Sequence, residues 1–138
     1  MITFRGVLAE DVDAWWPWIM DWVRAALEHG PGLYAPDDVL ERLRAREMQL
    51  WVACEDDRPI GCVTTSIERF PRKTALVIGV VGGESGRVRS WIRGMDELLR
   101  AFAAHEGCDA QLSEGRPGWD RFIGNGWRKV ATQYLREL

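Results

Sequence analysis

A glycine-rich turn is the stretch of this sequence best suited to bind a ligand. Residues 82–86 read Gly-Gly-Glu-Ser-Gly and separate an apolar run from an amphipathic one. Glycine lets a backbone approach a ligand closely, and the free amides and dipole of a helix start attract negative charge. The residues that could contact a phosphate are Gly82, Gly83, Ser85, Gly86, Arg87 and Arg89. The alternative is that the glycines only form a tight turn, since the stretch matches neither a P-loop nor GxGxxG.

Two elements are expected to hold this turn in place. Residues 74–81 form a nearly unbroken apolar and β-branched run, which is typical of a central strand covered on both faces. After the turn, apolar residues recur at intervals of three and four, which predicts a helix, and Gly107 suits its left-handed end. The apolar positions of this helix are Val88, Trp91, Ile92, Met95, Leu98, Leu99 and Phe102.

The rest of the chain supplies shorter elements on either side of this unit. Strand patterns lie at 2–7, 49–54, 60–67, 109–113 and 130–135, and helical patterns at 13–27, 37–48 and 117–123. The predicted order is β-α-α-β-β-β-α-β-α-β, an α/β fold of the α+β type in a single domain, residues 1–138. A helical crossover makes strand 109–113 parallel to strand 74–81. The sheet is then mostly antiparallel with one central parallel pair, and helices cover both faces.

This order also predicts where a ligand would bind. In open sheets, ligands lie at the carboxyl ends of strands where the connectivity changes. Here that place is residues 81–86 beside residues 113–116.

The first helix is unusually rich in tryptophan. Asp11 or Asp13 is its expected N-cap, and a start near Asp13 is favoured because Pro17 is tolerated only in a first turn. The predicted apolar face contains Trp15, Trp18, Ile19, Trp22, Val23, Ala26 and Leu27. Trp16 lies off this face. If exposed, Trp16 would be a contact for a partner or a homodimer, and core packing is the alternative.

Composition excludes several classes of protein. The net charge of −3 over 138 residues argues against a nucleic-acid surface. Three cysteines and two histidines lack the spacing of a metal site, so we expect buried, reduced thiols and no metal. No apolar run is long enough to span a bilayer, and no leader pattern is found at the N-terminus. We therefore predict a cytoplasmic protein without a membrane partner.

Several local sequences, together with the order of elements, resemble the GNAT N-acetyltransferase superfamily over essentially the whole chain. The matching segments are 51–53, 56–59, 60–61, the apolar strand 74–81, 102–108, and Phe122 followed by 126–127. The resemblance implies a splayed sheet with acetyl-CoA between the central strand and the following one. The pyrophosphate would lie on the turn already described, and further contacts would come from Val80, Val81 and Phe122.

A narrower resemblance is to small GNAT-like proteins encoded by tailed phages and prophages. It rests on residues 48–53, 71–73, 82–84 and 115–119. Against the superfamily pattern, Val88 and Ser90 replace glycines, and Phe122 stands where many members have a proton-donating tyrosine. The alternative function is therefore a non-catalytic GNAT-like domain that acts in protein binding or in virion or host interaction.

As an enzyme of this superfamily, the chain would transfer an acyl group from acetyl-CoA to an unknown amine. The amine would lose its proton to a carboxylate or to water while it attacks the thioester. Glu114, at the end of strand 109–113, is the first candidate for this base, and Glu68 is the second. The alternative is that both are surface carboxylates, with Glu114 paired to Arg116.

Overall fold

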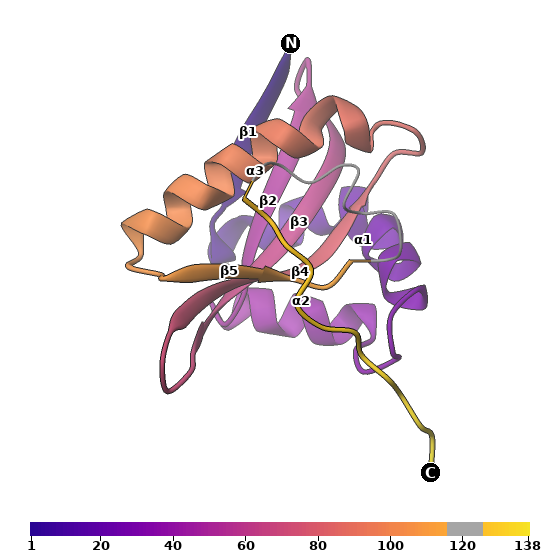
Figure 1. The fold of residues 1–138 in the computed structure, drawn as a ribbon. Helices are drawn as coiled ribbons and strands as arrows, with labels where there is room; N and C mark the ends of the chain where they lie inside the picture. The colour runs from indigo at the N-terminus through magenta and orange to yellow at the C-terminus, as the bar shows by residue number, and fades with distance from the viewer. Residues whose placement is uncertain (116–125) are drawn as a thin grey trace.

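The computed structural model describes residues 1–115 and 126–138, and within them five strands form one sheet whose spatial order follows the sequence (Figure 1). The strands are β1 (Ile2–Val7), β2 (Gln49–Glu55), β3 (Arg58–Arg69), β4 (Thr74–Gly83) and β5 (Ala110–Ser113). Strands β1 to β4 pair antiparallel, and β5 pairs parallel with β4. The predicted mixed sheet with its parallel pair is confirmed.

Helices cover both faces of this sheet, as predicted (Figure 1). Helices α1 (Val12–Glu28) and α2 (Pro36–Arg44) lie on one face, and α3 (Val88–His105) lies on the other. A 3₁₀ turn, η1 (Ala9–Asp11), leads into α1. Each face has its own hydrophobic cluster. The α1 cluster joins α1 and α2 to the sheet and includes Val12, Ile19, Val23, Leu43, Leu50 and Val52. The α3 cluster joins α3 to the other face and includes Leu76, Ile78, Trp91, Met95 and Leu99. Among the described residues, no helix has the length and apolar character needed to cross a membrane.

Helix α3 follows the predicted pattern closely. Trp91, Met95 and Leu99 are buried against the sheet at intervals of four residues. Gly94 lies in mid-helix because a Cβ there would be 2.5 Å from the ring of Phe4 on β1. Gly107 has a φ of 75°, the left-handed conformation expected after a helix end.

Helix α1 corrects the prediction for the tryptophans. Its buried stripe is Val12, Trp16, Ile19 and Val23, so Trp16 belongs to the core, with 7% of its surface exposed, and Trp18 is 64% exposed. Trp16 and Ile19 lie four and seven residues after Val12, which places all three on one face of the helix. Trp18 lies six residues after Val12 and therefore points to another face. Trp16 is therefore not a surface contact.

Asp11, one of the two predicted N-cap residues, takes the N-cap position of α1, whereas the favoured start near Asp13 is not observed. The helix begins at Val12, so Pro17 lies in its second turn and not in the first. Proline removes one backbone hydrogen bond, to the carbonyl four residues earlier, which is that of Asp13. Both residues are exposed, so water can hydrate that carbonyl.

Helix α2 is shifted toward the N-terminus relative to the prediction. Pro36 is its first residue, and the carboxylate of Asp38 accepts a 2.8 Å hydrogen bond from the amide of Ala35. The helix ends at Arg44 instead of continuing to residue 48, because Arg46 has a φ of 64°, which a right-handed helix does not accommodate.

The C-terminal part of the prediction is corrected as well. Residues 127–138 contain no regular secondary structure, so the predicted strand at 130–135 is not formed. A strand needs a neighbour that accepts its backbone hydrogen bonds, and this segment pairs with no strand among the described residues. The predicted helix at 117–123 lies outside the described residues.

Candidate functional site

Strand β4 extends beyond its parallel neighbour. The register between the two strands runs from Ala75 opposite Ala110 to Ile78 opposite Ser113, where β5 ends. Strand β4 continues for the five residues 79–83 toward the turn that precedes α3. The edge of β4 over these residues therefore has no partner in β5. We call this stretch the open edge.

A β-bulge lies at the start of the open edge. The register of β3 with β4 shifts between Val63 and Thr65, where β4 carries one extra residue. Thr64 compensates for the irregularity, because its hydroxyl oxygen accepts a 2.9 Å hydrogen bond from the backbone amide of Val80. The side chain of Thr64 is buried, so this bond occupies a polar group that would otherwise lack a partner.

The bulge reverses which face of the sheet the side chains of β4 point to. Leu76 and Ile78 belong to the α3 cluster, whereas Val80 belongs to the α1 cluster. Val81 then packs against the α3 cluster again. Val80 and Val81, both predicted to contact a cofactor, thus direct their side chains into the two cores, and a ligand at the open edge would meet their backbone.

The predicted turn glycines have two different roles. Gly82 and Gly83 belong to β4, and both fit closely against neighbouring backbone. A Cβ on Gly82 would be 2.8 Å from the carbonyl oxygen of Trp22 on α1, and a Cβ on Gly83 would be 2.7 Å from that of Ile60 on β3. Gly86 has a φ of 74° and open space where its Cβ would be. Packing therefore accounts for Gly82 and Gly83, and Gly86 leaves room for a ligand.

Two ion pairs fasten the turn to the tip of the β2–β3 hairpin. Arg58 donates a 2.7 Å hydrogen bond to Glu84, and this bond raises the pKa of Arg58 above its ordinary value. Arg87 donates a 2.7 Å hydrogen bond to Glu55 at the end of β2. The guanidinium of Arg87, predicted to bind phosphate, is therefore already paired with a carboxylate.

The first turn of α3 adjoins this turn. Ser85 and Arg89 are exposed beside the N-terminus of the helix. The amide and the hydroxyl of Ser90 both donate to the carbonyl of Arg87. These two donors of Ser90 are therefore already used and do not point to an anion. Ser85, Gly86 and Arg89 are thus the predicted phosphate contacts that lie on the exposed side of the turn.

The two candidate bases lie in different places. Glu114 directly follows β5, is exposed, and accepts a 2.8 Å hydrogen bond from the side-chain amide of Gln133. Glu68 is exposed on β3 opposite Ala75, about 13 Å along the strand from the start of the open edge. The structure brings Glu114, and not Glu68, to the carboxyl ends of the parallel strands. Phe122, and the Arg116 considered as a partner of Glu114, lie outside the described residues.

The cysteines are unsuited to nucleophilic catalysis. Burial raises the pKa of Cys62 to about 12, and burial also raises the pKa values of Cys54 and Cys108 above the ordinary value. The thiolate is the nucleophilic form, and it is scarce in all three at neutral pH. No group of three His, Cys, Asp or Glu side chains in the described part of the chain could hold a metal ion.

Sequence reasoning missed two residues that shape the open edge. Thr64 holds the bulge, and Trp22 places the backbone of α1 directly on β4. A usable signal was present at Gly79, because a glycine inside an apolar strand often marks a bulge. The partner that fills the space beside it, the Thr64 hydroxyl, follows only from the register of β3.

Solved structures of several acetyltransferases have a fold similar to that of this chain. The sequence matches no protein-family model and no curated protein. A GCN5-related N-acetyltransferase from Ralstonia eutropha JMP134 is 15% identical, with a TM-score of 0.75 over 99% of each chain. An aminoglycoside acetyltransferase from an uncultured soil metagenomic sample, solved with sisomicin, is 11% identical, with a TM-score of 0.73 over 99% of this chain and 97% of that one.

A third solved structure contains a cofactor. It is a predicted acetyltransferase with acetyl-CoA from Clostridium acetobutylicum, 14% identical, with a TM-score of 0.62 over 95% of this chain and 96% of that one. At these identities the similarity concerns the fold. The chain described here has the fold of the GCN5-related N-acetyltransferases, the GNAT fold.

Proposed function

We propose that this protein is an acyltransferase that binds acetyl-CoA along the open edge of β4 and transfers the acyl group to an amine. The observation that supports this most directly is the difference in length between the parallel strands, because β4 continues to Gly83 after β5 has ended at Ser113. Among the described residues no strand pairs with this side of the open edge, so its backbone groups can bind the amide groups of an extended ligand.

The turn after β4 fits the phosphate end of such a ligand in part. Gly86 leaves space, the first turn of α3 offers backbone amides with a favourable dipole, and Arg89 adds a positive charge nearby. Glu84 is negative, but its ion pair with Arg58 offsets that charge. Ser85, Gly86 and Arg89 would hold the phosphates, and Arg87 would keep its partner Glu55.

Acetyl-CoA supplies an activated thioester from which an amine can take the acyl group directly. Glu114 would accept the proton that the amine loses when its nitrogen bonds to the acyl carbon, and the sulfur would leave with the electron pair of the broken bond. The high pKa of the thiol of Cys62 favours this direct transfer over an acyl-cysteine route. Release of Glu114 from Gln133 would be needed before it meets the amine.

A second candidate function is a non-catalytic protein that uses the GNAT fold to bind another protein. The ion pair between Arg87 and Glu55 favours it, because a strong phosphate site would keep that arginine available. Val88 and Ser90 at the positions of glycines point the same way.

Calorimetric titration with acetyl-CoA separates the two functions. The transferase proposal expects micromolar binding that weakens about tenfold in Arg89→Ala, since a charge-assisted hydrogen bond is lost. Arg93→Ala, one turn further along α3, is the matched control and should bind as the wild type does. Absence of both heat and a thermal shift at about 1 mM acetyl-CoA would overturn the proposal and favour the protein-binding function.

A further inference from the structure

A pocket lies between the start of α1 and the tip of the β2–β3 hairpin. Its volume of about 420 Å³ is within the range of small-molecule sites. We call it the tryptophan pocket. The residues that line it are Ala14, Trp15, Trp18, Asp57, Arg58 and Pro59, and none of them belongs to the open edge.

The aromatic wall of the tryptophan pocket already holds one cation of the chain itself. The guanidinium carbon of Arg5 lies 5.3 Å from the centre of the Trp15 ring. The negative face of an indole attracts cations, and it does so more strongly than the ring of tyrosine or phenylalanine. Trp18 is 64% exposed, and among the described residues no cation lies over its ring. The indole of Trp18 can therefore receive a cation from solution.

Asp57 adds a carboxylate to the same pocket. Its side chain is exposed and forms no ion pair within the described part of the chain. Asp56 and Asp57 are the two residues between β2 and β3, with φ of 50° and 66°. Two-residue turns with positive φ at both positions favour glycine at the second one. The backbone therefore does not account for an aspartate at position 57, and a carboxylate beside two indoles suits a cationic ligand.

The positive charges near the pocket do not exclude a cation. Arg58 donates a 2.7 Å hydrogen bond to Glu84, and the carboxylate of Glu84 offsets its charge. The start of α1 carries the positive end of the helix dipole, and Asp11 at the N-cap opposes it. Arg5 is not one of the lining residues.

We propose that the tryptophan pocket binds a small quaternary ammonium ion, with the cationic head against the ring of Trp18 and near the carboxylate of Asp57. Asp57 is the only lining residue whose side chain accepts hydrogen bonds, since tryptophan and arginine only donate. A primary ammonium would bring three N–H donors to this one carboxylate, whereas a quaternary ammonium brings none. Ala14 and Pro59 offer apolar contacts to its methyl groups. This proposal does not depend on the acyltransferase function.

Calorimetric titration of the full chain with choline tests the site. We expect a dissociation constant of about 1 mM, which corresponds to a few weak cation–π and ionic contacts. The matched control ligand is 3,3-dimethylbutan-1-ol, which has the shape of choline with a carbon atom in place of the charged nitrogen. It should bind about tenfold more weakly, because it has no charge for the indole or the carboxylate. Equal affinities of the two ligands, or no heat at about 20 mM choline, would overturn the proposal.

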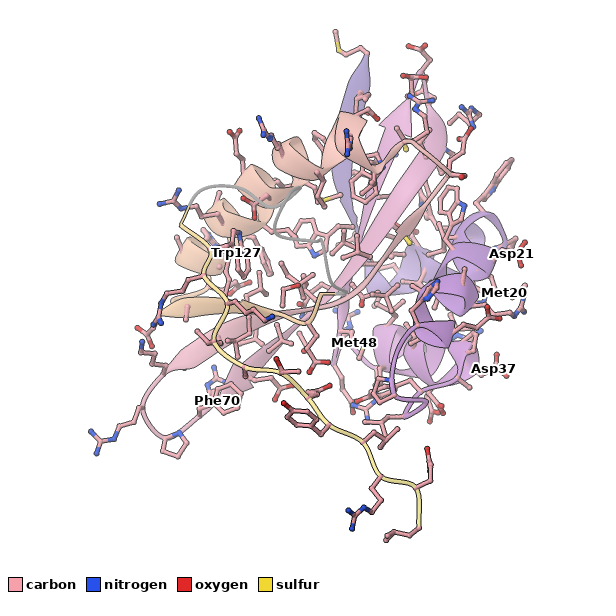
Figure 2. All side chains as sticks on the ribbon, turned by 45° about the vertical axis from the view of Figure 1, so that its right-hand side comes forward. Met20, Asp21, Asp37, Met48, Phe70 and Trp127 are labelled. Carbon is pink, nitrogen blue, oxygen red and sulfur yellow. The ribbon has the colours of Figure 1, made fainter. Side chains whose placement is uncertain are left out.

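Variants of the pocket separate its two contributions. Trp18→Ala should weaken choline binding about tenfold, and Asp57→Asn and Asp57→Gly should each weaken it about fivefold while they retain the turn. Phe70→Ala is the control for the loss of an exposed aromatic ring, and Figure 2 shows Phe70 on the opposite side of the molecule from Met20 and Asp21 of α1. Asp56→Asn removes the other carboxylate of the turn. Both controls should bind as the wild type does, and unchanged binding by Trp18→Ala would contradict the proposal.

Two further measurements give the place of binding and the source of the cation. In nitrogen–proton correlation spectra, choline should shift the indole signals of Trp15 and Trp18 and leave that of Trp127 in place. Shifts confined to other tryptophans would overturn the assignment. Sedimentation with phosphatidylcholine vesicles distinguishes two sources: a wild type that sediments when Trp18→Ala does not identifies a lipid headgroup, and choline binding without sedimentation identifies a free small molecule.

Discussion

The hydroxyl oxygen of Thr64 on β3 lies 2.9 Å from the backbone nitrogen of Val80 on β4, and both residues are buried. This single hydrogen bond occupies the amide that the bulge removes from the regular ladder between the two strands. Beyond the bulge, the side chains of β4 therefore point to the opposite faces of the sheet, while the buried polar groups remain hydrogen-bonded. The direction of the open edge depends on this contact.

Replacing Thr64 with valine keeps the shape of the side chain but leaves the amide of Val80 without an acceptor. We expect a loss of about 1–3 kcal/mol in the free energy of unfolding, measured by urea denaturation. Thr64→Ser retains the hydroxyl and should lose less. Equal stability of the valine variant and the wild type would show that the bond contributes nothing to the bulge.

A second prediction concerns the contact of Trp91 with β3. A Cβ on Gly61 would be 2.3 Å from the indole of Trp91, which is 1% exposed and has little room to move. Gly61→Ala should lower stability by about 1–3 kcal/mol and alter the near-ultraviolet circular dichroism of the tryptophans. Gly30→Ala is the control, since its Cβ would lie 3.4 Å from the nearest atom. Similar melting temperatures for the two variants would contradict the packing described here.

The raised pKa of Cys62 predicts how stability depends on pH. The native state keeps the thiol protonated up to about pH 12, whereas the unfolded chain loses the proton near pH 9.0. The unfolded state then binds fewer protons in this window, so stability falls as the pH rises through it. Between about pH 8 and about pH 10.5 the loss due to Cys62 should be about 2 kcal/mol.

The difference between the wild type and Cys62→Ala isolates this contribution from other groups that titrate at high pH. We expect the stability advantage of the wild type over the variant to shrink as the pH rises. Parallel curves over the same range would mean that Cys62 ionises in the folded state as readily as in the unfolded one.

Glu114 is the residue whose replacement should affect the proposed reaction most. If an amine acceptor is found by a thiol-release screen, Glu114→Gln should lower kcat by about 100-fold or more and flatten the pH profile, with acetyl-CoA binding unchanged. Glu97→Gln changes an exposed carboxylate on α3 and should leave kcat as it is. Full activity of Glu114→Gln would assign the proton transfer to another group or to water.

The parts of the fold that follow from local patterns could be predicted from the sequence. The buried residues of α3 recur with the helical period, and Gly107 marks its end, because both depend only on neighbouring residues. The buried face of α1 was harder to predict, because four tryptophans within eight residues are compatible with more than one apolar stripe. Only packing on the sheet selects Trp16 over Trp18.

The features of the open edge depend on residues far apart in the sequence and could not be predicted in the same way. Apart from Gly79, the bulge leaves no trace in a run that is apolar at almost every position, because no alternation exists there to be interrupted. The partner of Arg87 is Glu55, 32 residues earlier, and only the sheet register brings them together. The sequence alone therefore does not show whether an arginine near a glycine turn has a guanidinium that can bind phosphate.

The contact of Gly82 with the backbone of Trp22 has a mechanical consequence. Where a helix carbonyl lies directly on a strand, no layer of side chains remains to yield under stress. We therefore expect helix α1 and the end of β4 to shift together. A change of shape on ligand binding would be absorbed at the turn formed by residues 84–87, whose two exposed or half-exposed ion pairs weaken in salt.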